Sequence, residues 1–180
     1  MIAGYQGLWN FTDDGINDVE FVSVLIDKLA GTNSTPGEYN IDRRRIYATG
    51  MSNGGIFSHK LAIELSDKIA AVACVTGPMS GLSLSKTPKR PITVIQASGT
   101  TDPIVDWNGV EELGTISVDD TIAWWNKINQ TSATPEVYEY PQIAAHDPTK
   151  VTKYSYLGGI NGTKVILYKI DQMGHTWPMG

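Results

Sequence analysis

The feature that most constrains this chain is a Gly-x-Ser-x-Gly pattern at residues 50–54, with Ser52 at its centre. A short β-prone run, residues 45–49, leads into it, and a helical pattern, residues 56–65, follows. A strand that passes directly into a helix needs a tight turn, and we expect glycine at both ends of the pattern because side chains there would collide. Such a turn lifts the Ser52 hydroxyl above the sheet, as catalysis by a nucleophile requires. It also places the N–H of Asn53 at a helix N-terminus, where partial positive charge favours an oxyanion.

The rest of the chain predicts alternating strands and helices. Helical patterns cover residues 15–29, with Asp13 and Asp14 as expected caps, and residues 117–129, with Val118, Ile122 and Trp125 on one face. Three apolar runs of strand length are typical of buried strands: residues 70–76, 91–97 and 164–170. For residues 70–76 we expect burial on both faces of the sheet. Alternating patterns at residues 137–140 and 151–156 predict exposed or edge strands. Together they predict an α/β fold, a single domain over residues 1–180 with a mostly parallel sheet flanked by helices.

Composition limits the partners. The chain has 180 residues, a net charge of −5 and no basic run, which argues against nucleic acids and anionic membranes as partners. No apolar stretch is long enough to span a bilayer, and we expect no signal peptide in the sequence as given. Cys74, the single cysteine, is expected in the core, so disulfide use does not indicate a compartment. We expect neither a metal nor a cofactor, because no histidine–carboxylate spacing and no lysine-bearing phosphate loop is present.

A serine nucleophile needs a base, and the base needs a carboxylate to hold its tautomer. Of the three histidines, His59 falls two turns along the helix after Ser52 and is interpreted as a surface or packing residue. His146 lies in a polar connection between edge strands and is the weaker candidate, whereas His175 follows the last buried strand and is the expected base. Asp102 follows another buried strand and is the expected acid, with Asp106 as the fallback.

The order Ser52, Asp102, His175 is the order used by α/β-hydrolases. Four segments resemble the secreted polyhydroxybutyrate depolymerase, feruloyl esterase and acetylxylan esterase group of that fold: residues 15–21, 39–55, 99–105 and 174–178. The resemblance covers nearly the whole chain. It implies Ser52 as nucleophile, Asp102 as acid and His175 as base, and it makes Trp177 a candidate wall for the substrate's acyl group. It also implies a secreted protein.

Relative to that group, the sequence looks shortened at both ends. The group's early strands, and the loop that provides a second oxyanion N–H beside that of Asn53, have no counterpart here. Loss of one such donor typically costs 10²–10³ in rate, so we expect low activity or a substitute donor from residues 1–7 or a second subunit. The strand over residues 45–49 is then expected at a sheet edge, and an exposed apolar edge favours a homodimer or larger assembly.

The expected function is that of a serine carboxylic-ester hydrolase. Its substrates would be short-chain esters, feruloyl or acetyl esters of polysaccharides, or hydroxyalkanoate esters. The alternative is a weak or inactive hydrolase remnant that binds carbohydrate or a protein. A further alternative keeps the three catalytic residues but cleaves peptides or thioesters.

Overall fold

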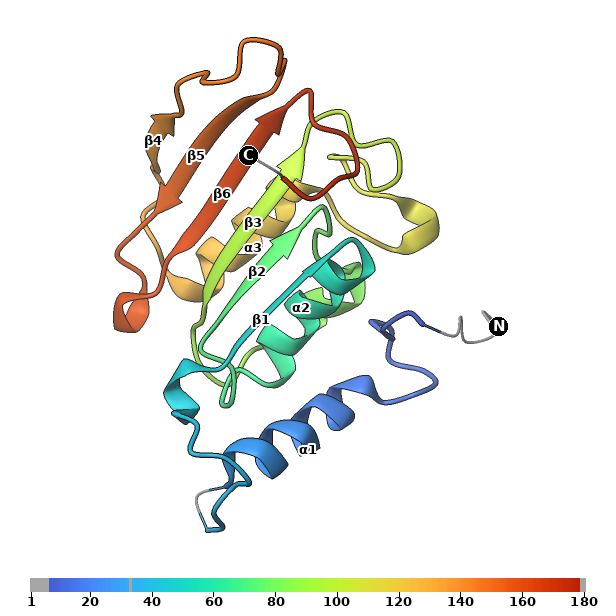
Figure 1. Cartoon of the computed structure of the whole chain (residues 1–180), viewed down its shortest axis with the longest axis vertical. Helices are drawn as coiled ribbons and strands as arrows, with labels where there is room; N and C mark the ends of the chain where they lie inside the picture. Colours follow the sequence, from blue (N-terminus) through green and yellow to red (C-terminus); the bar gives the residue numbers. More distant parts are fainter. Residues whose placement is uncertain (1–6, 33, 179–180) are drawn as a thin grey trace.

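The computed structural model describes residues 7–32 and 34–178, whose strands form one six-stranded sheet in the order β1-β2-β3-β6-β5-β4. Figure 1 shows the arrows of β1, β2, β3 and β6 side by side and pointing the same way. The parallel strands are β1 (Tyr47–Met51), β2 (Ala71–Val75), β3 (Thr93–Gly99) and β6 (Val165–Asp171). β5 (Lys150–Tyr156) pairs antiparallel with both β6 and β4 (Glu136–Glu139), so only β4 of the two predicted edge strands lies at the far edge. The predicted fold class is therefore confirmed.

Three α-helices accompany the sheet in the described part of the chain: α1 (Asp18–Ala30), α2 (Asn53–Glu64) and α3 (Val118–Asn129). Ser117 caps α3 through its side chain, and Asn17 caps α1 by accepting the N–H of Glu20. The prediction that Asp13 or Asp14 caps α1 is wrong. Gly15 has a φ of +90°, which no α-helix contains, so the helix cannot begin before it.

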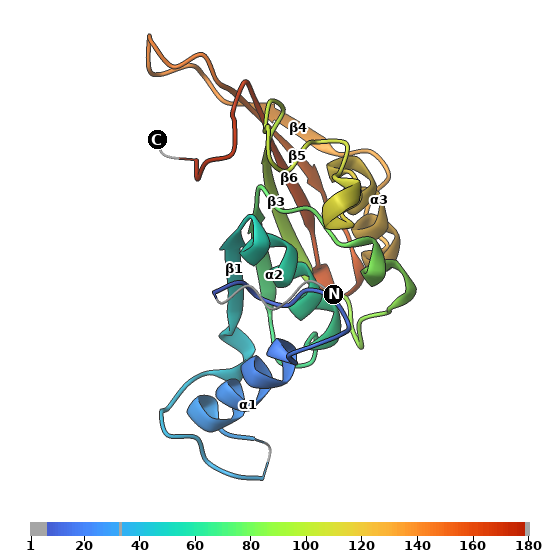
Figure 2. The ribbon, with the colours of Figure 1, turned by 90° about the vertical axis from the view of Figure 1, so that its right-hand side faces the viewer.

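The core lies between one face of the sheet and the helices α2 and α3 (Figure 2). Strand residues Val72 and Cys74 face this core, as do Val118, Ile122 and Trp125 on the predicted face of α3. The opposite face of β2 carries Ala71 and Ala73, which are only half-buried. The prediction that this strand is buried on both faces is wrong, because the helices that contact it pack on the side of Val72.

His59 lies in this core, not at the rim of the sheet. Its Nδ1 accepts the indole N–H of Trp125 at 3.1 Å, and its Nε2 lies 2.9 Å from Oε1 of Gln96. Because an indole can only donate, Nδ1 is unprotonated and Nε2 carries the hydrogen. Burial lowers the pKa of His59 to about 4, so the ring is neutral at neutral pH. Of the two roles expected for this histidine, surface or packing, the structure shows the packing role.

β1 lies at one edge of the sheet, as predicted, with its outer backbone groups unpaired by any described strand. Tyr47 on this strand is 63% exposed, and the outward face of α1 exposes Phe21 and Val24. An unpaired edge beside apolar side chains is a template for pairing with another polypeptide.

Two structural absences apply to residues 7–32 and 34–178. None of their helices is both long and apolar enough to cross a bilayer. Nor do these residues gather three or more His, Cys, Asp or Glu side chains in an arrangement that would hold a metal ion. Cys74 is buried as expected, and burial raises the pKa of its thiol.

Candidate active site

Backbone strain concentrates at the carboxyl ends of the parallel strands. Of the five non-glycine residues with positive φ in the described chain, three directly follow such ends: Ser52 after β1, Thr76 after β2 and Gln172 after β6. Strained residues persist only where their surroundings hold them, and they are enriched at active sites. In Figure 1 the segments that follow these strands lie at one end of the sheet. This rim is therefore the candidate active site.

Ser52 occupies the turn between β1 and α2 with φ 57° and ψ −121°. Its N–H donates to the carbonyl of Val75 on β2, and its carbonyl accepts the N–H of Ile56 in α2. A Cβ on Gly50 would lie 2.5 Å from the backbone of Gly54, so glycine is required at position 50. The expectation that Gly54 is equally restricted is wrong, since a Cβ there would meet nothing within 4 Å.

This asymmetry gives a paired prediction. Gly50→Ala is expected to lower the free energy of unfolding by about 3 kcal/mol, because two backbone segments would have to separate. Gly54→Ala is expected to leave it unchanged or raise it by up to about 1 kcal/mol, since alanine favours a helix over glycine. Urea denaturation of both variants measures the difference. Equal stabilities would contradict the turn geometry.

Asp102 and His175 meet, as predicted, although they lie 73 residues apart. Oδ2 of Asp102 is 2.8 Å from Nδ1 of His175, and the side chains are 1% and 13% exposed. The other carboxylate oxygen accepts the N–H groups of Ile104 and Val105, both at 2.9 Å. Because the carboxylate can only accept, Nδ1 carries the hydrogen and Nε2 presents a lone pair. A histidine held in this tautomer is ready to act as a base.

The loops after β3 and β6 hold this pair together, through contacts that sequence reasoning did not find. The carbonyl of Met173 accepts both the N–H and the hydroxyl of Thr101, at 3.2 and 3.1 Å. Thr100 donates its N–H to Ile170, and its hydroxyl accepts the N–H of Gln172. A Cβ on Gly99 would lie 2.0 Å from the carbonyl of Met173, so glycine is needed where the loops touch. Gly99, Thr100 and Thr101 lie in segment 99–105, which resembles the esterase group. That resemblance was the signal in the sequence that could have pointed to these contacts.

The other candidates take different places. Asp106 accepts from the backbone and side chain of Asn108 in its own turn, and His146 is exposed in the connection between β4 and β5. Trp177 is 46% exposed two residues after His175. Among the described residues, no hydrogen bond joins the Ser52 hydroxyl to His175, so the meeting of nucleophile and base stays a prediction. Residues 1–7 were named as a source of a second oxyanion donor, and residues 1–6 of this segment lie outside the described residues.

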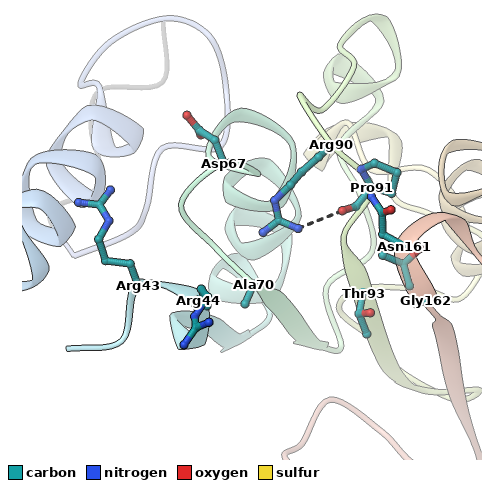
Figure 3. A pocket seen from close by; sticks show the side chains of 10 residues that line it. Arg43, Arg44, Asp67, Ala70, Arg90, Pro91, Thr93, Asn161 and Gly162 are labelled. Carbon is teal, nitrogen blue, oxygen red and sulfur yellow. Dashed lines mark hydrogen bonds between the residues drawn. The ribbon is translucent and has the colours of Figure 1, made fainter. Parts of the chain in front are cut away.

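Two cavities of the described chain lie away from this rim. One of about 470 Å³ opens at the amino ends of the strands, between Arg43, Arg44 and Arg90 (Figure 3). Another, of about 310 Å³, lies between the loop before α1 and Lys60 on α2. Neither includes Ser52, Asp102 or His175, so neither cavity indicates this rim. The ordered carboxylate–imidazole pair and the strained serine indicate it instead.

No model of a known protein family matches the chain. It is similar to three curated proteins named as esterases. They are a bifunctional acetylxylan esterase/xylanase of Neocallimastix patriciarum (33% identity over 108 residues, 60% of this chain), "Putative esterase NocK" of Nocardia uniformis subsp. tsuyamanensis (27% over 176 residues, 91%) and feruloyl esterase B of Piromyces equi (36% over 101 residues, 52%). The alignments span only 15%, 49% and 17% of those proteins.

Among solved structures, the chain resembles an acetyl xylan esterase from Aspergillus awamori with a TM-score of 0.54 and 12% identity. The match covers 90% of this chain and 63% of that one. The fold is α/β-hydrolase-like. Relatives by sequence and by structure are thus named as ester hydrolases, and the polyhydroxybutyrate depolymerase part of the resemblance stays a prediction.

Proposed function

We propose that the protein is a serine carboxylic-ester hydrolase with Ser52 as nucleophile, His175 as base and Asp102 as acid. The observation that carries the proposal is the hydrogen bond between Asp102 and His175, at the same rim as a serine on a strained strand-to-helix turn. Similarity to acetylxylan and feruloyl esterases supports the same chemistry.

In the proposed reaction, Nε2 of His175 takes the proton of the Ser52 hydroxyl as its oxygen bonds to the ester carbonyl carbon. Asp102 holds Nδ1–H and stabilises the imidazolium that forms. The tetrahedral oxyanion accepts the N–H of Asn53, the first residue of α2, where the helix dipole adds positive potential. The C–O bond to the alcohol then breaks, and the alcohol leaves with the proton from His175. Water hydrolyses the acyl-enzyme by the same steps, which frees the acid and Ser52.

For the substrate, we propose acetyl or feruloyl esters of polysaccharides, because two relatives are named as an acetylxylan esterase and a feruloyl esterase. The exposed Trp177 is proposed as a wall for the acyl group.

Reaction with a fluorophosphonate probe tests the proposal, since only an activated serine is phosphonylated rapidly. We expect about one label per chain, located on Ser52 by peptide mass mapping. Absence of labelling would favour the inactive remnant that acts as a binding module, whereas labelling of another serine would contradict the assignment of the nucleophile.

We further propose that the exposed β1 edge pairs with a second copy of the chain. Tyr47 and the apolar outer face of α1 would be covered in such a homo-oligomer. A monomer in light scattering at micromolar concentration would contradict it.

A further inference from the structure

The side chain of Asn53 connects the residue after the nucleophile to a distant segment. Its Oδ1 accepts the N–H of Trp9 at 2.8 Å, and its Nδ2 donates to the carbonyl of Trp9 at 2.9 Å. One planar amide is thus paired with both polar groups of one backbone residue, 44 positions earlier in the chain. Two bonds from a rigid group fix orientation as well as position.

The ring of Trp9 reinforces this contact. It stacks on Phe57 with centroids 5.0 Å apart and planes 4° apart, and Phe57 lies one helical turn after Asn53 on α2. Its other stacking partner is Phe21 on α1, at 6.4 Å. In Figure 2 the segment that precedes α1 crosses in front of α2, in agreement with these contacts. Backbone and ring of Trp9 therefore hold the first turn of α2 from outside the sheet.

The turn at Ser52 needs such restraints because its backbone angles are unfavourable for a residue with a side chain. The sheet supplies one restraint through Val75, and α2 supplies another through Ile56. Neither acts directly on the N–H of Asn53, because the first N–H groups of a helix have no acceptor within it. The tether to Trp9 is the side-chain contact that acts on that residue.

The same segment is anchored a second time, away from the turn. Nζ of Lys60 donates to the carbonyl of Thr12 at 2.6 Å and to Asp13 at 2.8 Å, two helical turns beyond Asn53. Loss of the Asn53 side chain would therefore leave the segment attached to α2. What it would change is the orientation of residue 53.

We propose that the side chain of Asn53 is a positioning residue: by binding the backbone of Trp9, it aims its own N–H at the oxyanion. This inference rests on the proposed esterase function. It assigns the side chain a task distinct from that of its own backbone donor, and it gives Trp9 a role in the reaction without contact with the substrate.

Asn53→Ala tests the inference because it keeps the backbone N–H and removes only the tether. We expect kcat for a p-nitrophenyl ester to fall about 10-fold, less than the 10²–10³ of a lost donor, with KM changed less than twofold. Asn53→Asp keeps an acceptor for the N–H of Trp9 but cannot donate to its carbonyl, and it adds negative charge beside the oxyanion. It should lower kcat further than alanine, whereas the favourable place of aspartate in the first turn of a helix offsets part of the lost hydrogen bond and limits the fall in Tm.

The matched control is Asp13→Asn, which weakens the second anchor of the same segment. It should lower Tm without changing kcat. A wild-type kcat in Asn53→Ala, or losses of kcat that follow Tm across the three variants, would overturn the positioning role. If wild-type turnover does not exceed that of Ser52→Ala, the proposed function itself fails and the inference falls with it.

Discussion

Ser52→Ala is expected to lower kcat for a short-chain p-nitrophenyl ester by about 10⁶-fold, since the variant has no hydroxyl to form the acyl-enzyme. Ser52 makes no side-chain capping bond to α2, so the fold should tolerate the change. Initial rates measured at saturating substrate, with circular dichroism to verify folding, provide the comparison.

The control is Ser132→Ala, which removes an exposed hydroxyl from the loop after α3. It should keep wild-type turnover. Equal turnover by wild type and Ser52→Ala would refute the serine mechanism, and a comparable loss in the control would point to damage unrelated to the nucleophile.

Asp102→Asn is expected to lower kcat by about 10⁴-fold at nearly unchanged stability. The amide oxygen can still accept the N–H groups of Ile104 and Val105. Its NH₂ would then face Nδ1 of His175, which must become an acceptor, so the hydrogen moves to Nε2. A base that already carries a hydrogen on Nε2 cannot take the proton of Ser52.

The fallback acid gives the matched control for this prediction. Asp106→Asn changes an exposed carboxylate that accepts only within its own turn, from Asn108. Turnover should stay at the wild-type level. If Asp106→Asn were the damaging change and Asp102→Asn harmless, the acid would be misassigned, and a urea midpoint for each variant would separate this from a loss of folded protein.

Much of the fold followed from periodicity. Apolar runs located β2, β3 and β6 to within two residues, and the helical spacing of Val118, Ile122 and Trp125 identified the buried face of α3. The meeting of Asp102 with His175 also followed, because both were assigned to carboxyl ends of parallel strands, and these ends share one edge of the sheet.

What could not be predicted depends on tertiary contacts. The N-cap of α1 was misassigned because residues 10–17 contain several Asp and Asn residues that could each cap a helix. The positive φ of Gly15 rules out the two aspartates before it and leaves Asn17 as the cap. The contact of Gly99 with Met173 and the pairing of Asn53 with Trp9 join segments distant in sequence, which no local pattern records. The half-burial of Ala71 likewise depends on which face of the sheet the helices cover, since alanine occurs both in the core and at the surface.

The neutral imidazole of His59 makes stability depend on proton uptake. Its pKa is about 4 in the folded chain against an ordinary 6.5, so between these values the unfolded chain binds a proton that the folded chain excludes. Above pH 6.5 this difference does not affect the free energy of unfolding. As pH falls below 6.5 the free energy of unfolding decreases, by about 3 kcal/mol at pH 4. Mild acid therefore destabilises the fold through a buried core residue, the ring of His59 that Trp125 and Gln96 contact.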